Sequence, residues 1–161
     1  MNNKDIMNTC TFTGHRPERL ELPEEQVKEW LEEQISHAVD EGYTDFISGM
    51  QRGVDLWAAK AVLKLRSEGK QIRLIAACPF QGMENRWDMD WQKRYRTILS
   101  AADEVHYICE HPGRRAFFAC NHWMVDHSSR LIAVYTGAPG GTKETIEYAR
   151  KNKRDVVLLE L

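Results

Sequence analysis

The stretch Phe46-Ile47-Ser48-Gly49-Met50-Gln51-Arg52-Gly53-Val54-Asp55 joins a short apolar run to a helical pattern through a turn that holds two glycines. A second turn of this kind, Gly137-Ala138-Pro139-Gly140-Gly141-Thr142, follows the apolar run 131–135. A glycine at such a junction lets the backbone approach a ligand closely, and the helix beyond it aims N–H groups and the positive end of its dipole at that ligand. The two turns therefore predict a phosphate site, and with it a nucleotide.

Strand-like and helix-like segments alternate from one end of the chain to the other. The strand-like segments are the apolar runs 10–13, 46–47, 72–78, 104–108, 131–135 and 156–159. The helix-like segments are 23–42, 53–69, 87–102, 116–127 and a short one from 142. This alternation predicts an α/β fold with a single doubly wound, mainly parallel sheet of about six strands and helices on both faces, which is a Rossmann-like arrangement. In such sheets ligands bind outside the carboxyl ends of the strands, near the point where the strand order reverses.

The bulk composition is that of one globular domain. The chain has 161 residues, of which 42% are hydrophobic and 29% charged, and we expect residues 1–161 to form a single domain. No run approaches the roughly 18 apolar residues of a membrane span, and the polar start is not that of a signal peptide. We therefore expect a cytoplasmic protein without a membrane partner. The formal net charge of -2 gives no overall attraction to nucleic acid.

The turn after the first strand is Thr13-Gly14-His15-Arg16-Pro17. Gly14 permits close approach of the backbone to a ligand, while His15 and Arg16 offer hydrogen-bond donors at the carboxyl edge of the sheet. A plain surface loop with a charged rim would carry the same residues. The position after the first strand favours the binding interpretation.

The turn after the second strand combines Gly49 and Gly53 with Arg52, and Asp55 lies close behind in the helix. Asp55 can cap N–H groups of that helix. It can also accept a hydrogen bond from a ribose hydroxyl, as acids do in dinucleotide-binding folds. The spacing matches neither G-x-G-x-x-G nor G-x-x-x-x-G-K-[ST], so neither a Rossmann dinucleotide site nor a P-loop is predicted.

The turn after the fifth strand brings Gly140, Gly141 and Thr142 to the start of a helix. Backbone N–H groups and the threonine hydroxyl can converge there on a phosphate, although Thr142 can equally be an ordinary N-cap. The histidines do not have metal-ligand spacing, since His122 and His127 do not share a helix face well. No Ser–His–Asp or Cys–His set follows from the spacing. We therefore predict no catalytic residue, no metal site and no cofactor.

Taken in order, these turns resemble those of the SLOG superfamily, a Rossmann-like group that includes LOG-type phosphoribohydrolases and the DNA-processing DprA/Smf proteins. The chain looks closest to the small YpsA-like branch of bacterial proteins. The resemblance covers nearly the whole chain and rests on the segments 13–17, 48–55, 121–126 and 131–142. It implies a nucleotide or nucleotide-derived ligand between the loops after strands one, two and five. LOG enzymes carry P-G-G-x-G-T-x-x-E, whereas Thr145 stands here three residues after Thr142.

Our leading hypothesis is a ligand-sensing protein whose partner is a small-molecule nucleotide or nucleotide-derived metabolite. The residues expected to contact it are Gly14, His15, Arg16, Ser48, Gly49, Arg52, Gly53, Asp55, Gly140, Gly141 and Thr142. The arginines would neutralise the phosphate, the Ser48 and Thr142 hydroxyls would donate to it, and Asp55 would bind a sugar hydroxyl.

Two alternatives stay open. One is a nucleoside 5′-monophosphate phosphoribohydrolase that uses Glu144 or Glu147, and the other is a single-stranded nucleic-acid binder. The net charge of -2 argues against nucleic acid as a partner. A homo-oligomer is left open.

Overall fold

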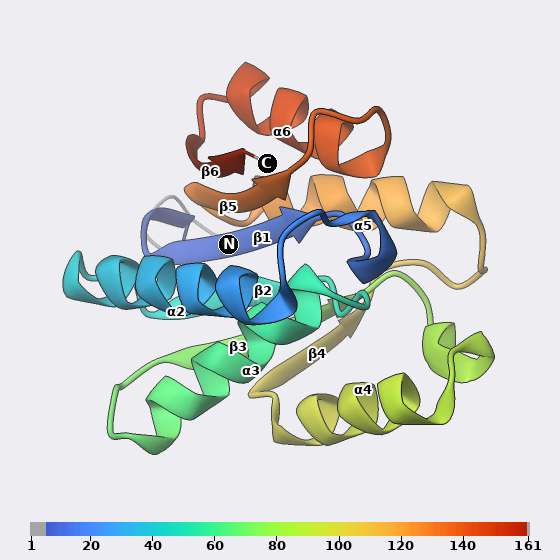
Figure 1. The fold of residues 1–161 in the computed structure, drawn as a ribbon, viewed down its shortest axis with the longest axis horizontal. Helices are drawn as coiled ribbons and strands as arrows, with labels where there is room; N and C mark the ends of the chain where they lie inside the picture. Colours follow the sequence, from blue (N-terminus) through green and yellow to red (C-terminus); the bar gives the residue numbers. More distant parts are fainter. Residues whose placement is uncertain (1–5, 161) are drawn as a thin grey trace.

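One sheet of six parallel strands organises the computed structural model, which describes residues 6–160 (Figure 1). The strands are β1 (Thr9–Gly14), β2 (Asp45–Ser48), β3 (Arg73–Cys78), β4 (Glu104–Tyr107), β5 (Arg130–Tyr135) and β6 (Asp155–Glu160). The helices are α2 (Glu24–Asp40), α3 (Val54–Ser67), α4 (Met89–Ala101), α5 (Arg114–Asp126) and α6 (Gly141–Lys151), with short 3-10 helices η1 (Pro17–Arg19) and η2 (Met83–Arg86). The spatial order of the strands is β4-β3-β2-β1-β5-β6.

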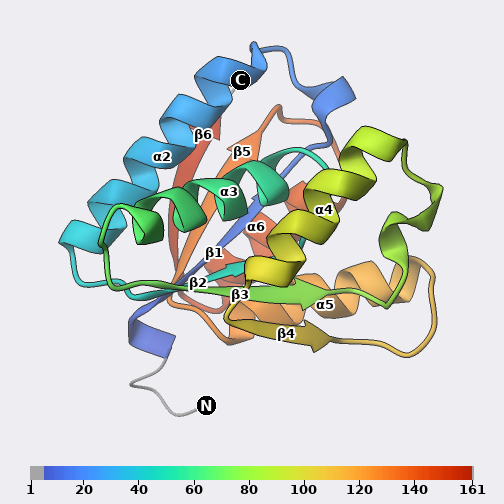
Figure 2. The same cartoon turned by 90° about the horizontal axis from the view of Figure 1, so that it is seen from below.

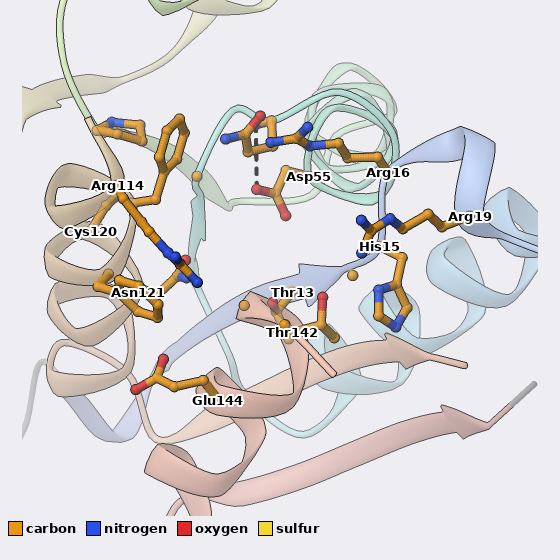
Figure 3. A pocket seen from close by; sticks show the side chains of 18 residues that line it. Thr13, His15, Arg16, Arg19, Asp55, Arg114, Cys120, Asn121, Thr142 and Glu144 are labelled. Atoms are coloured by element: carbon orange, nitrogen blue, oxygen red, sulfur yellow. Dashed lines mark hydrogen bonds between the residues drawn. The ribbon is translucent and has the colours of Figure 1, made fainter. Parts of the chain in front are cut away.

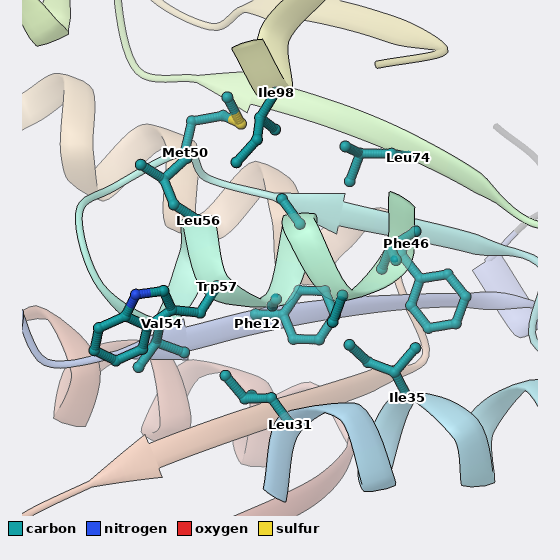
Figure 4. Packing of buried hydrophobic residues seen from close by; sticks show 14 of the residues in the cluster. Phe12, Leu31, Ile35, Phe46, Met50, Val54, Leu56, Trp57, Leu74 and Ile98 are labelled. Atoms are coloured by element: carbon teal, nitrogen blue, oxygen red, sulfur yellow. The ribbon is translucent and has the colours of Figure 1, made fainter. Parts of the chain in front are cut away.

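Helices cover both faces of the sheet, so the predicted α/β, Rossmann-like arrangement is confirmed (Figure 2). Side chains alternate between the two faces along each strand. Phe12 and Phe46 point toward α2 and α3 in the largest hydrophobic cluster (Figure 4). On the opposite face, Ile47 packs with α5 and Leu131 packs with α6. Because the inner strands are buried on both sides, they appear in the sequence as apolar runs.

The order of the strands reverses at β1. The chain moves outward from β1 through β2 and β3 to β4, and then returns to β5 on the other side of β1. Thr11 of β1 therefore pairs with Ile47 of β2, and Gly14 of β1 pairs with Val134 of β5. The connections after β1 and β5 lead to helices on opposite faces, and a doubly wound sheet leaves a crevice at this point.

The predicted element boundaries lie within one or two residues of the observed ones. The physical reason for such a small difference is clearest at the start of the helix predicted over 87–102. The side chain of Asp88 accepts a hydrogen bond from the N–H of Trp91 at 3.0 Å, so α4 begins at Met89. Trp87 lies before the helix and packs edge-on against Tyr95, with ring centroids 5.5 Å apart.

Helices α2 to α6 contain between 11 and 17 residues, and each buries one side against the sheet or a neighbouring helix. Within residues 6–160, none of them combines the length and the apolar character that crossing a membrane requires.

Candidate functional site

A crevice of about 560 Å³ opens at the carboxyl ends of β1, β2 and β5 (Figure 3). Its lining comes from the segments that follow these strands, from α5 and from the start of α6. A doubly wound sheet binds ligands at this position, and the volume is within the range of ligand and cofactor sites. The crevice is therefore the candidate functional site.

Most of the residues predicted from the sequence come together here. Those that line the crevice are Gly14, His15, Arg16, Gly49, Asp55, Gly140, Gly141 and Thr142. The other three are Ser48, Arg52 and Gly53, and they belong to the packing of the β2–α3 turn. The Ser48 hydroxyl donates to the carbonyl of Asp55 at 2.8 Å, and Arg52 pairs with Glu18 at 2.8 Å. Their polar groups are thus engaged outside the crevice lining.

The glycines of the crevice serve two different purposes. A Cβ at Gly14 would lie 2.4 Å from Val54, and one at Gly49 would lie 2.8 Å from Oδ2 of Asp55. At these two positions packing within the protein by itself requires glycine, whether or not a ligand approaches the backbone. At Gly140 and Gly141 the nearest atoms would be 4.0 and 3.8 Å away, which is ordinary contact. Among the glycines that line the crevice, those of the turn after β5 leave open space beside the backbone.

Helix α6 begins at the crevice without a side-chain cap. Its N-cap is Gly140, whose φ of 136° favours glycine. The amides of the first turn and the positive end of the helix dipole therefore lie at the crevice. Thr142 is 6% exposed and adds a hydroxyl group at the same place. This end of α6 has the chemistry of an anion site.

Three arginines supply positive charge to the crevice. Arg16 and Arg19 reach it from the segment after β1, and Arg114 reaches it from the first turn of α5 on the opposite side (Figure 3). In the described part of the chain none of the three forms an ion pair within 4.0 Å, whereas Arg52 pairs with Glu18. Guanidinium groups without a carboxylate partner at a crevice are suited to bind phosphate.

His15 fixes the end of β1 to the segment after β5. Its side chain is 5% exposed, its Nε2 lies 3.1 Å from the hydroxyl of Thr136, and its ring stacks on Tyr135. Burial and, to a smaller extent, the charge of Arg19 lower the pKa of His15. The imidazole is therefore mainly neutral at pH 7 and does not add to the positive charge of the crevice.

Asp55 is a largely buried carboxyl group at the crevice. It lies in the first turn of α3 and is 7% exposed. Its Oδ2 accepts a hydrogen bond from the N–H of Gln51 at 3.3 Å, and no basic side chain within residues 6–160 pairs with it. Burial raises the pKa of Asp55 to about 7, and the hydrogen bond from Gln51 opposes this shift only in part. Near neutral pH both the neutral acid and the carboxylate are populated.

Helix α5 and the start of α6 contribute a wall that was only partly predicted, since Glu144 was named as a candidate catalytic residue whereas Phe117 and Asn121 were not among the expected contacts. Phe117 packs edge-on against Phe80, with ring centroids 5.7 Å apart, and Asn121 lies about one turn further along α5. On α6, Glu144 lines the crevice and its Oε1 lies 2.6 Å from Nε2 of His122. The periodicity of apolar residues predicts which face of a helix is buried. It does not predict which part of that face the neighbouring elements leave uncovered.

Two signals in the sequence point to crevice residues that are not among the predicted contacts, Arg19 and Arg114. Arg19 lies only three residues beyond Arg16, in the same connection after β1. Arg114 is followed by the adjacent aromatic residues Phe117 and Phe118, and its guanidinium lies 5.8 Å from the ring centroid of Phe118. Surfaces that bind single-stranded nucleic acid combine basic residues with aromatic rings.

A family model described as the YspA SLOG family matches residues 10–158. A UPF0398 protein from Halalkalibacterium halodurans is 31% identical over 157 residues, which cover 92% of this chain and 83% of the relative. A UPF0398 protein from Bacillus thuringiensis is 30% identical over 154 residues, which cover 90% of this chain and 84% of the relative.

Two solved structures share the fold. DNA processing protein A (DprA) from Streptococcus pneumoniae aligns with a TM-score of 0.63 and 18% identity over 94% of this chain and 50% of that protein. DprA from Helicobacter pylori, described by its single-stranded DNA binding mode, aligns with a TM-score of 0.66 and 16% identity over 96% of this chain and 66% of that protein. This chain therefore spans half of the first protein and about two thirds of the second. At these identities the likeness is one of fold.

These matches correct the predicted partner. The net charge of -2 favoured a small-molecule nucleotide over nucleic acid, yet the same fold occurs in a protein with a single-stranded DNA binding mode. A net charge averages over the whole surface, whereas three unpaired arginines gather at one crevice against the carboxyl groups of Asp55 and Glu144. The expectation of a small-molecule partner in place of nucleic acid is therefore contradicted.

Proposed function

We propose that this chain, which belongs to the YspA SLOG family, binds single-stranded nucleic acid in the crevice at the carboxyl edge of its sheet. In this proposal the uncapped start of α6 and the crevice arginines bind phosphates of the strand. The aromatic side of the crevice contacts a base. The single-stranded DNA binding mode of the H. pylori protein, which shares the fold, supports this choice of partner.

The observation that carries the proposal is the arrangement of the three unpaired arginines. Arg16 and Arg19 lie on one side of the crevice and Arg114 lies on the other, with the start of α6 between them (Figure 3). A nucleic-acid strand carries a phosphate at every nucleotide, so it can engage cations on both sides as it crosses. A single phosphate ion is too small to contact the arginines on both sides of the crevice.

The apolar side of the crevice suits a nucleic-acid base. Phe117 and Phe118 are half-buried on the side that lines the crevice, and Pro79 lies beside them in the lining. Stacking of a base on an aromatic ring contributes about 1–3 kcal/mol and tolerates every base. We therefore expect the protein to bind single strands with little preference for their base sequence.

The test is fluorescence anisotropy of a labelled thymidine oligonucleotide at several salt concentrations. We expect the wild-type protein to bind with an affinity that falls as salt rises. Arg16→Ala combined with Arg114→Ala should weaken binding at least about tenfold and reduce the salt slope by about 1 for each arginine removed. Undetectable binding by the wild type at low salt, or equal binding by the double variant, would refute the proposal.

Arg150→Ala is the matched control. Arg150 is exposed in the last turn of α6, at the end of an 11-residue helix whose other end meets the crevice. At about 1.5 Å per residue this places it far from the proposed phosphate site. Its removal takes away one positive charge, as each of the two crevice substitutions does, and should leave affinity and salt slope unchanged. A loss equal to that of the double variant would mean that binding depends on overall charge, and not on the crevice.

A further inference from the structure

We propose that Asp55 binds the strand as a neutral carboxylic acid whose O–H donates a hydrogen bond to a phosphate oxygen, which rests on the proposed function of the crevice. Asp55 lies at the crevice with its carboxyl group between Arg114 on one side and Arg19 on the other (Figure 3). The role differs from that of the arginines, because a carboxyl group can assist an anion only in its protonated form.

The surroundings of Asp55 do not neutralise a negative charge. The titratable or charged groups that line the same crevice are His15, Arg16 and Arg19 after β1, Arg114 and Cys120 on α5, and Glu144 on α6. None of the basic ones forms an ion pair with Asp55 in the described residues. Its apolar neighbours, Met124 and Cys120, both lie on α5. Met124 approaches Gly49 at the same place as Oδ2 of Asp55, and Cys120 is close enough to feel the charge of Asp55. A carboxylate here has little water around it and no ion-pair partner among residues 6–160.

The two carboxyl oxygens of Asp55 have different environments. Oδ2 accepts the hydrogen bond from the N–H of Gln51, and Gly49 leaves the space that Oδ2 occupies. Oδ1 makes no hydrogen bond with another residue of 6–160, and unlike Oε2 of Glu144 it is not sealed from solvent. Gln51 therefore holds the group in place, while the other oxygen can carry a proton toward a ligand.

The electrostatics favour the neutral form once a strand is bound. Burial raises the pKa of Asp55 to about 7, so little free energy is needed to protonate it near neutral pH. A phosphate beside it disfavours the carboxylate further, because two negative charges would share a site with little water. By linkage, the strand must raise the pKa of Asp55 if protonation tightens binding.

From the sequence alone, Asp55 is expected to have a different role, as an acceptor for a sugar hydroxyl. The two roles predict opposite outcomes. An acceptor binds best when ionised, so its ligand would bind more tightly as pH rises. A donor binds best when protonated, so its ligand is released as pH rises.

The experiment measures the Kd of the labelled thymidine oligonucleotide between about pH 6.5 and pH 8.5 for the wild type, Asp55→Asn and Asp55→Ala. We expect the wild-type affinity to fall by about tenfold or more over this range. Asp55→Asn keeps a donor that does not titrate and retains every other charged group, so its affinity should stay constant and exceed that of the wild type at the upper end. Asp55→Ala has neither oxygen and should bind weakly throughout.

The possible failures are distinguishable. If the wild type binds the strand with the expected salt dependence but shows no change with pH, or if Asp55→Asn binds as weakly as Asp55→Ala, the donor role is wrong and the proposed function stands. If the wild type does not bind at any pH, both are wrong. Carboxyl ¹³C NMR gives an independent check, because the pKa of Asp55 should rise when the strand is added, and a fall would overturn the donor role.

Discussion

The two glycine turns look alike in the sequence but differ in what surrounds them. In the β2–α3 turn, a Cβ at Gly49 would lie 2.8 Å from Asp55 and one at Gly53 would lie 2.9 Å from the ring of Pro17. In the β5–α6 turn, a Cβ at Gly137 would meet nothing within 4 Å, and one at Gly141 would meet only Asn121 at 3.8 Å. The first turn is packed against protein, and the second is open.

A glycine at a strand–helix junction can therefore make room either for the protein's own side chains or for a ligand. In the packed turn the missing side chain lets Asp55 and Pro17 come close to the backbone. In the open turn it leaves the first amides of α6 accessible from the crevice. Substitutions in the packed turn should therefore reduce stability, while substitutions in the open turn should reduce binding.

The largest effect is expected for Gly53→Ala in the packed turn. Gly53 has a φ of 91°, and the new methyl group would meet Pro17 at 2.9 Å. Backbone strain and the clash together should lower the free energy of unfolding by about 3 kcal/mol. Gly69→Ala is the control, because Gly69 has a φ of 101° with nothing within 4 Å of the added carbon. Equal losses for both variants in denaturant unfolding would mean that Pro17 does not pack as described.

The next effect is expected for Asp55→Asn, which should stabilise the protein at high pH. The pKa of Asp55 rises from 3.8 to about 7 on folding, so the native state binds more protons than the unfolded state between these values. Stability is therefore lost as pH rises through this range, and the asparagine variant avoids that loss. We expect a gain on the order of a few kcal/mol at pH 8 that disappears toward pH 4. A gain that is independent of pH in thermal unfolding would contradict the buried acid.

In the open turn, Gly141→Ala should separate binding from stability. Its φ is not in the left-handed region and the methyl group makes only ordinary contact, so the free energy of unfolding should change by less than about 1 kcal/mol. The same methyl group would stand where a phosphate approaches the first amides of α6. We expect the affinity for the oligonucleotide to fall by about tenfold, which anisotropy would measure. Unchanged affinity in the folded variant would exclude this turn from the phosphate site.

The smallest effect is expected for Arg52→Ala. Arg52 belongs to the packed turn and pairs with Glu18, whose side chain is 57% exposed. A pair at the surface contributes at most about 1 kcal/mol, so stability should hardly change. Because Arg52 does not line the crevice, strand affinity should also stay the same, whereas Arg16→Ala should lower it. Equal losses of affinity for the two variants would contradict the assignment of Arg16, and not Arg52, to the binding site.

The fold could be predicted from the sequence to within one or two residues at most boundaries. Strand residues such as Phe46 and Ile47 are buried on both faces, and a run buried on both faces is apolar throughout. Gly42 and Gly69 lie at helix ends and have a φ of 101°. Because this backbone conformation favours glycine, the residue type itself indicates where the helix ends. The apolar runs and the glycines at helix ends are local signals, because each lies within a few residues of the strand or helix end that it predicts.

The site could be predicted only in part, because its composition depends on contacts between distant segments. Arg16 and Arg52 are equivalent in the sequence, since each follows a strand and stands beside a glycine turn. Only the fold places Glu18 beside Arg52 and leaves Arg16 at the crevice. Likewise, Phe117 and Asn121 lie on a helix face whose uncovered part is set by its neighbours.

By itself the sequence determined the alternation of strands and helices, the edge of the sheet that carries the glycine turns, and the resemblance to the SLOG superfamily. These features depend on residue type and spacing along the chain. Only the folded arrangement sets which glycines face protein and which face open space, and which arginines lack an ion pair with the other residues of 6–160. It also buries Asp55 without a basic partner in that part of the chain. Those properties depend on desolvation and on distances between segments far apart in the chain, so they exist only after the sheet has assembled.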